Sequence, residues 1–158
     1  MDDDRDLLLH VWREVCRHLE VAQSAGTILG LLAPRLPVEL LEVVSLDLAR
    51  GSSLRRTAGC RGAEPRQTAR ARPLDGPDCA ILRAWVPSGR VLWHGPGTGE
   101  ADPPLRVLLG GAPATGSWLA GPLAGEHGAT GALLLRALPR APFAPAHAGL
   151  VGALLEPF

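Results

Sequence analysis

Gly116-Ser117-Trp118-Leu119-Ala120-Gly121-Pro122-Leu123 is followed by the turn Gly125-Glu126-His127-Gly128 and by a second apolar run, Ala129-Thr130-Gly131-Ala132-Leu133-Leu134-Leu135. Two apolar runs joined by a short glycine-bounded turn predict a β-hairpin. Phe143 comes next, and a helical pattern then runs from Pro145 to the end of the sequence. A closing helix of this kind would cover one face of the sheet to which the hairpin belongs.

The N-terminal third predicts two helices. An acidic start precedes the first, which runs from Leu7 to about Leu19 and carries apolar residues at three- and four-residue steps. A second helix is expected over about 22–33, with Pro34 and Pro37 at its end. The apolar stripe of the first helix consists of Leu8, Val11, Trp12, Val15 and Leu19.

The middle of the chain alternates short strands, loops and helices. Strands are expected over 39–49, 54–59 and 90–94, and short helices over 77–86 and 103–109. The segment 61–76 is polar, lacks periodicity and is predicted to be a surface loop. This order predicts a single α+β domain over residues 1–158 with one antiparallel sheet. The N-terminal and C-terminal helices would share one face of the sheet, and the middle segments would cover the other.

Composition limits the classes of function. The 158 residues are 46% hydrophobic and 20% charged, enough for one packed core, and the formal net charge of zero argues against nucleic acid or an anionic membrane as a direct partner. The acidic N-terminus is unlike a signal peptide, and no apolar run approaches the roughly 20 residues that span a bilayer. The three cysteines include no close pair, so a cytoplasmic location is expected.

The whole order of elements resembles a GAF domain, which is related to PAS domains. The segments Leu7-Leu8-Leu9-His10-Val11-Trp12-Arg13-Glu14-Val15-Cys16-Arg17-His18-Leu19-Glu20 and Leu36-Pro37-Val38-Glu39-Leu40 are similar to the N-terminal sensory GAF domain of bacterial sigma-54-dependent transcription activators. The resemblance implies a non-catalytic sensor of a small molecule or of redox state, belonging to a longer regulator and controlling an adjoining AAA+ ATPase domain.

The resemblance also implies a homodimer that pairs through its terminal helices. The alternative is that the same apolar stripes pack on the sheet of their own chain. The residues predicted for the dimer interface are Leu8, Val11, Trp12, Val15, Leu19, Leu150 and Leu154.

GAF domains form a ligand pocket between the sheet and the middle segments, and apolar walls with a few polar groups suit such a pocket. The alternative is that the tryptophans are core residues and that His94 lies at the surface. The basic segment with Arg61, Arg66, Arg70 and Arg72 could clamp an anion or simply be solvated. The pocket candidates are Cys79, Trp85, Trp93, His94 and Trp118.

Two other functions stay open: a cysteine-dependent reductase of free methionine sulfoxide, with Cys60 and Cys79 as candidate thiols, and a ligand-free dimerisation module. The cysteine positions do not match the reductase pattern, so no catalytic residue is predicted. The histidines are scattered, so no metal site is predicted. No bilin motif is found, and the absence of Asn and Lys excludes the Asn-Lys-x-x-x-Phe signature of cyclic-nucleotide-binding GAF domains. The cofactor or ligand is left undetermined.

Overall fold

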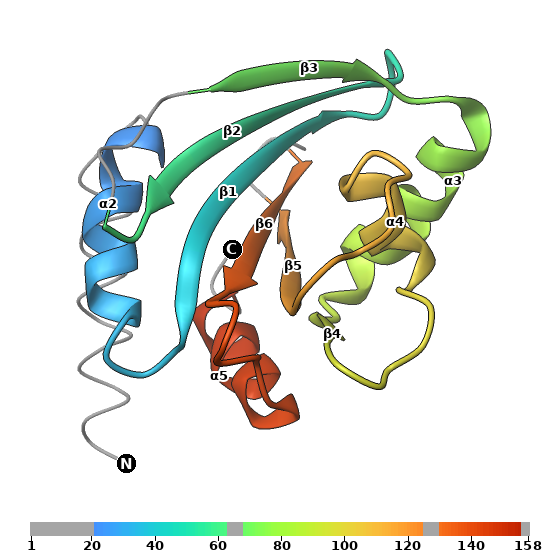
Figure 1. Cartoon of the computed structure of the whole chain (residues 1–158). Coiled ribbons are helices and arrows are strands. Elements are labelled where there is room, and N and C mark those ends of the chain that lie inside the picture. The colour runs from blue at the N-terminus through green and yellow to red at the C-terminus, as the bar shows by residue number, and fades with distance from the viewer. Residues whose placement is uncertain (1–20, 63–67, 125–129, 156–158) are drawn as a thin grey trace.

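A six-stranded antiparallel sheet is the centre of the molecule, with strand order β3-β2-β1-β6-β5-β4 (Figure 1). The computed structural model describes residues 21–62, 68–124 and 130–155. The helix predicted over 7–19 lies outside these residues. The α+β class and the single antiparallel sheet predicted from the sequence are confirmed.

The hairpin that decides the fold is formed by β5 (Trp118–Ala124) and β6 (Thr130–Ala137). These strands are buried for most of their length, as their apolar sequences require. The chain then reaches α5 (Pro145–Leu155), the predicted closing helix.

The first half of the sheet is a second hairpin, β1 (Val38–Asp47) and β2 (Ser52–Cys60), which follows α2 (Val21–Leu32). In its turn, the Asp47 side chain accepts a hydrogen bond from the Arg50 backbone N–H at 3.0 Å. Gly51 has φ +65°, a left-handed conformation that favours glycine.

The prediction of a loop over the whole of 61–76 is wrong. Residues Ala69–Pro73 form β3, which pairs with β2 at the edge of the sheet. The strand alternates alanine with arginine and is mostly exposed, so it lacks the apolar pattern that identifies a strand. The backbone of β2 supplies its hydrogen-bond partners, and that long-range pairing is not visible in the local sequence.

The middle segments agree with prediction. They begin with α3 (Gly76–Trp85), where the Asp75 side chain caps the helix by accepting from the Asp78 N–H at 2.7 Å. The remaining elements are the 3-10 helix η1 (Val86–Ser88), β4 (Leu92–His94) and α4 (Pro103–Leu108).

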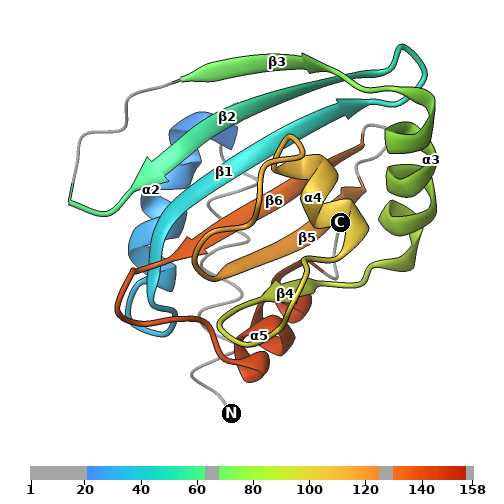
Figure 2. The ribbon, with the colours of Figure 1, turned by 45° about the vertical axis from the view of Figure 1, so that its right-hand side comes forward.

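The sheet separates two apolar layers. One contains buried residues of α2 and α5, together with Leu41 and Leu135 of the central strands. The other lies between the sheet and α3 and α4, and includes Val44, Leu82 and Leu134. Figure 2 shows α4 in front of β5 and β6, with α2 behind the sheet. The predicted division of helices between the two faces is therefore confirmed for every helix in the described ranges.

Candidate functional site

A pocket of about 260 Å³ lies between α4 and the β1-β2-β3 half of the sheet. The central strands provide an apolar floor through Val44 and Leu46, and α3 provides Leu82. The end of α4 forms the opposite wall. The lining residues are Val44, Leu46, Ser53, Arg55, Arg70, Ala71, Arg72, Leu74, Leu82, Val107, Leu108, Leu109 and Gly110.

Strand alternation places the polar groups of this pocket. Side chains two residues apart on a strand point to the same face, so Ser53 and Arg55 of β2 both face α4. On β3, Arg70 lies directly opposite Arg55, and Arg72 lies opposite Ser53. Three guanidinium groups therefore line the same pocket from two neighbouring strands.

Arg55 is held by a buried carboxylate. The Glu42 side chain on β1 is 8% exposed and accepts a hydrogen bond from Arg55 Nε at 2.8 Å. Arg55 Nη2 donates to the same oxygen, Oε2, and Thr57 Oγ1 donates to the other carboxylate oxygen at 3.4 Å. These hydrogen bonds compensate for the cost of burying the Glu42 carboxylate in the sheet.

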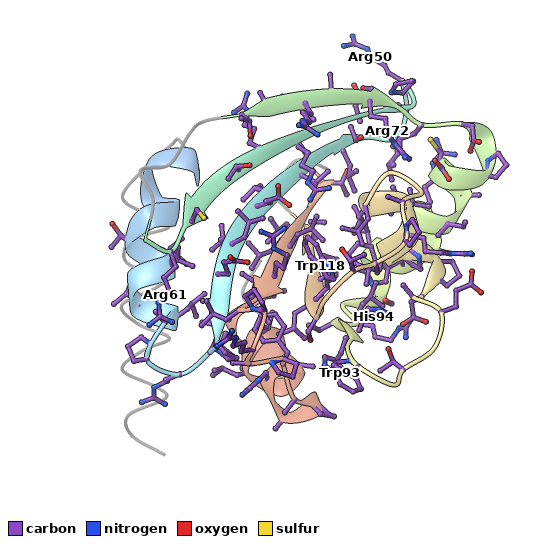
Figure 3. All side chains as sticks on the ribbon, viewed as in Figure 1. Arg50, Arg61, Arg72, Trp93, His94 and Trp118 are labelled. Atoms are coloured by element: carbon purple, nitrogen blue, oxygen red, sulfur yellow. The ribbon has the colours of Figure 1, made fainter. Side chains whose placement is uncertain are left out.

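Arg72 is held in a similar way at the other end of the pocket. Its Nη2 donates to Asp78 Oδ2 at 2.7 Å, joining β3 to the first turn of α3. A side-chain carbon built on Gly110 would lie 3.5 Å from Arg72 Nη1, so the same guanidinium also lies against the end of α4. Arg72 therefore links three elements around the pocket (Figure 3).

Trp118 lies between this pocket and a second hollow. The Arg55 and Arg136 guanidinium carbons are 6.0 and 5.8 Å from its ring centroid, distances that allow cation–π attraction. Arg136 lines the second hollow, of about 370 Å³, together with Glu39, to which it is joined by a 3.2 Å ion pair. The ring is buried, and its Nε1 donates to the Thr115 carbonyl at 2.9 Å.

The five sequence candidates are placed around the pocket but do not line its wall. Cys79, Trp85 and Trp118 belong to the apolar layer under α3 and α4. His94 is buried at the end of β4, with Nδ1 3.1 Å from Thr98 Oγ1. Trp93 packs against the α5 layer and donates from Nε1 to the Phe143 carbonyl at 3.0 Å, while Figure 3 shows it beside His94. Trp118 comes nearest to the pocket, through Arg55.

Two of the predicted dimer residues lie in the described part of the chain. Leu154 is 5% exposed and packs into the core of its own chain. Leu150 is partly buried against the same layer. The other five, Leu8, Val11, Trp12, Val15 and Leu19, lie outside the described residues.

Cys60 and Cys79 lie at opposite ends of β2. Cys60 is the last residue of the strand, whereas a side-chain carbon at Gly51, just before the strand, would lie 3.9 Å from Cys79 Sγ. The first and last residues of this nine-residue strand are eight steps apart, which is roughly 26 Å at about 3.3 Å per step. The two thiols therefore cannot form a disulfide with each other in this fold. Cys16 lies outside the described residues.

Other site types find no support in the ranges that the structure describes. No group of three or more His, Cys, Asp or Glu side chains is close enough there to hold a metal ion. None of the helices in those ranges combines the length and apolarity needed to cross a bilayer.

Sequence reasoning did not single out Glu42, Arg55 or Arg136. A usable signal existed for Glu42, because it shares the inward register of Val44 and Leu46 and is the acidic member of an otherwise apolar set. The sequence identifies Arg70 and Arg72 as basic residues but predicts a loop around them. Their role depends on the pairing of β3 with β2, which only the tertiary structure reveals.

Solved structures resemble this chain, and 17 of their chains match it. The GAF domain of a phosphoenolpyruvate-protein phosphotransferase from Coxiella burnetii matches with a TM-score of 0.57 and 17% identity, over 97% of this chain and 88% of that one. Free methionine-R-sulfoxide reductase from Neisseria meningitidis, in complex with its substrate, matches with a TM-score of 0.57 and 15% identity, over 97% and 84%. The phycocyanobilin-bound GAF domain of a cyanobacterial phytochrome matches with a TM-score of 0.60 and 12% identity, over 97% and 90%.

The sequence matches no protein-family model and no curated protein. The structural matches show that this chain has a GAF fold. At these identities they do not determine its activity, because proteins that share this fold include both an enzyme and a chromophore-binding domain.

Proposed function

We propose that this domain is a non-catalytic sensor that binds a small molecule in the 260 Å³ pocket between α4 and the β1-β2-β3 half of the sheet. The pocket itself is the observation that carries the proposal. It combines an apolar floor and wall with a small number of oriented polar groups, the composition expected of a ligand site.

The separation of the described cysteines favours this function over the reductase alternative. Thiol chemistry with a resolving cysteine requires two sulfurs in contact, and Cys60 and Cys79 are separated by the length of β2. The matched structure from Neisseria meningitidis is a reductase bound to its substrate, so the fold accommodates that chemistry, but this pair of cysteines does not provide it.

The pocket can be tested with two adjacent serines. Ser53 lines it and Ser52, exposed on the same strand, does not. We expect Ser53→Phe to fill the pocket and abolish thermal stabilisation by any metabolite that stabilises the unmodified chain, whereas Ser52→Phe retains it. A metabolite that stabilises both variants equally binds elsewhere and contradicts this site.

The regulatory context rests on the resemblance of segments 7–20 and 36–40 to sigma-54-dependent activators. In our proposal, occupancy of the pocket controls an adjoining AAA+ ATPase, and the cytoplasmic domain pairs with a second copy through its terminal helices. A reading frame that continues into a Gly-rich phosphate loop and a Gly-Ala-Phe-Thr-Gly-Ala segment supports this context. A neighbouring domain of another class contradicts it and leaves the pocket proposal intact.

A further inference from the structure

The wall of the pocket has two chemically different sides. Guanidinium groups of Arg55, Arg70 and Arg72 line the β2-β3 side, while leucine and valine side chains line the α4 side. No carboxylate is among the lining residues. A ligand that satisfies both sides has an anionic end and an apolar body.

The charges around the pocket do not cancel. Glu42 neutralises Arg55, and Asp78 neutralises Arg72. The Arg70 side chain forms no ion pair or hydrogen bond with any residue in the described ranges. Three cations and two carboxylates leave one positive charge, which matches a ligand with one negative charge.

The strand register adds a reason for an anion to bind here. Arg55 and Arg70 are directly opposite each other on β2 and β3, and like charges in that position repel. A carboxylate placed between them would reduce the repulsion and accept hydrogen bonds in the planar fork geometry that guanidinium groups offer.

The pocket also limits the size of the ligand. Its volume of about 260 Å³ lies just below the range for small-molecule sites, about 300–1,000 Å³. Val107 and Leu108 of α4 are buried, and with Leu82 they offer room for a short hydrocarbon rather than a second polar group.

Resting on the proposed sensory function, we propose that the ligand is a small monocarboxylate with a short apolar body, whose carboxylate is bound by Arg70 and whose hydrocarbon packs on α4. Arg70 is the specificity residue, because its guanidinium group is the one in the pocket wall that no described carboxylate already holds. Arg55 and Arg72, each already paired with a carboxylate, position the strands.

Calorimetric titration at constant ionic strength tests the proposal with butyrate as the probe. Butyramide has a similar shape without the charge, and inorganic phosphate has charge without the hydrocarbon. We expect butyrate to bind and the other two to bind at least about tenfold more weakly, the scale of a charge-assisted hydrogen bond. If butyramide binds as tightly as butyrate, the proposal that the ligand is an anion is wrong. If phosphate binds more tightly than butyrate, the proposal that the charged group is a carboxylate is wrong. Absence of butyrate binding to the unmodified chain would also overturn the proposal.

Arginine variants assign the role of Arg70. Arg70→Gln is expected to weaken butyrate binding about tenfold or more, and Arg70→Lys is expected to weaken it less. Arg56→Gln is the matched control, because Arg56 is exposed, adjacent to Arg55 on β2, and absent from the pocket wall. Equal weakening by the Arg56 and Arg70 changes would show a general electrostatic effect and contradict the assignment.

The Ser53→Phe variant separates this inference from the proposed function. A neutral metabolite that binds the unmodified chain and Arg70→Gln alike, but not Ser53→Phe, refutes the monocarboxylate and preserves the sensory pocket. If butyrate still binds to the Ser53→Phe variant, both the monocarboxylate assignment and the proposed binding site are refuted.

Discussion

Glu42 and Arg55 connect the middle of the sheet to the proposed ligand site. Glu42 is nearly completely buried, whereas the Arg55 side chain is 26% exposed and lines the pocket. A buried carboxylate retains its charge at low cost only while a cation and hydrogen-bond donors remain beside it. The same pair therefore contributes both to stability and to the electrostatics of the site.

Removing one member of this pair should destabilise the protein more than removing both. We expect Arg55→Met to lower the free energy of unfolding by about 2 kcal/mol or more, because it leaves the Glu42 carboxylate buried without its cation. In the double variant Glu42→Met/Arg55→Met most of this loss should be recovered. Urea denaturation of the two single variants and the double variant measures the coupling, and simple additivity would contradict it.

Gly51 in the β1–β2 turn fixes where β3 meets this hairpin. It has φ +65°, and a side-chain carbon there would lie 2.9 Å from the Leu74 carbonyl oxygen. Gly51→Ala should therefore cost at least about 2 kcal/mol, from backbone strain together with a clash against main chain.

Gly97 provides the control for that change. It also has a positive φ, +81°, but apart from the residue itself and its two chain neighbours no heavy atom lies within 4 Å of the added carbon. Gly97→Ala should cost only about 1 kcal/mol, from strain alone. Thermal unfolding of the two variants compares them directly, and an equal loss would mean that the contact with Leu74 has no energetic consequence.

At the scale of secondary structure, apolar residues and the turn residues between them were a sufficient guide where an element is buried against the core. The hairpin of β5 and β6, the helices α3 and α4, and the closing helix α5 all follow apolar runs that turn residues interrupt. The edge strand β3 does not bury such a face, so its alternating Ala and Arg residues gave no apolar signal.

The pocket was less predictable than the elements that form it. Its wall combines residues from β2, β3 and α4, which are far apart in the sequence. The tryptophans and His94 are expected, from the resemblance to GAF domains, to line a pocket between the sheet and the middle segments. In the structure the tryptophan ring nitrogens donate to the carbonyls of Arg90, Phe143 and Thr115, and the His94 ring is hydrogen-bonded to Thr98.

The helix predicted in the N-terminal segment can be tested as a dimer interface. If the apolar stripe with Val11 and Val15 is part of the dimer interface, the double variant Val11→Glu/Val15→Glu introduces like charges into that interface. It should therefore convert a dimer into a monomer. Sedimentation velocity measures the change. The control Arg13→Ser/Arg17→Ser alters the polar side of the same predicted helix and should leave the assembly unchanged. An unchanged sedimentation coefficient for the glutamate variant would exclude this stripe as the dimer interface.

At the scale of the whole molecule, one sheet separates the proposed ligand site from α2 and α5. Val44 and Leu134 face α3 and α4, whereas Leu41 and Leu135 of the same strands face α2 and α5. A structural change at the pocket can therefore affect α5 only through the strands that separate the two layers. A ligand can bias the arrangement of those helices only if it binds the alternative arrangements with different affinity.

Hydrogen exchange across the sheet tests this connection. Butyrate, as the probe, should slow exchange of the amides of β3 and α4, because it bridges Arg70 and the apolar wall that α4 provides. If the domain transmits occupancy to its terminal helices, exchange in α5 should also change, although α5 lies on the opposite face. Arg70→Gln should abolish both effects. If only the amides of β3 and α4 are protected, the pocket binds the ligand but does not transmit its occupancy to α5. The strands that the two layers share would then not carry the effect of binding across the sheet.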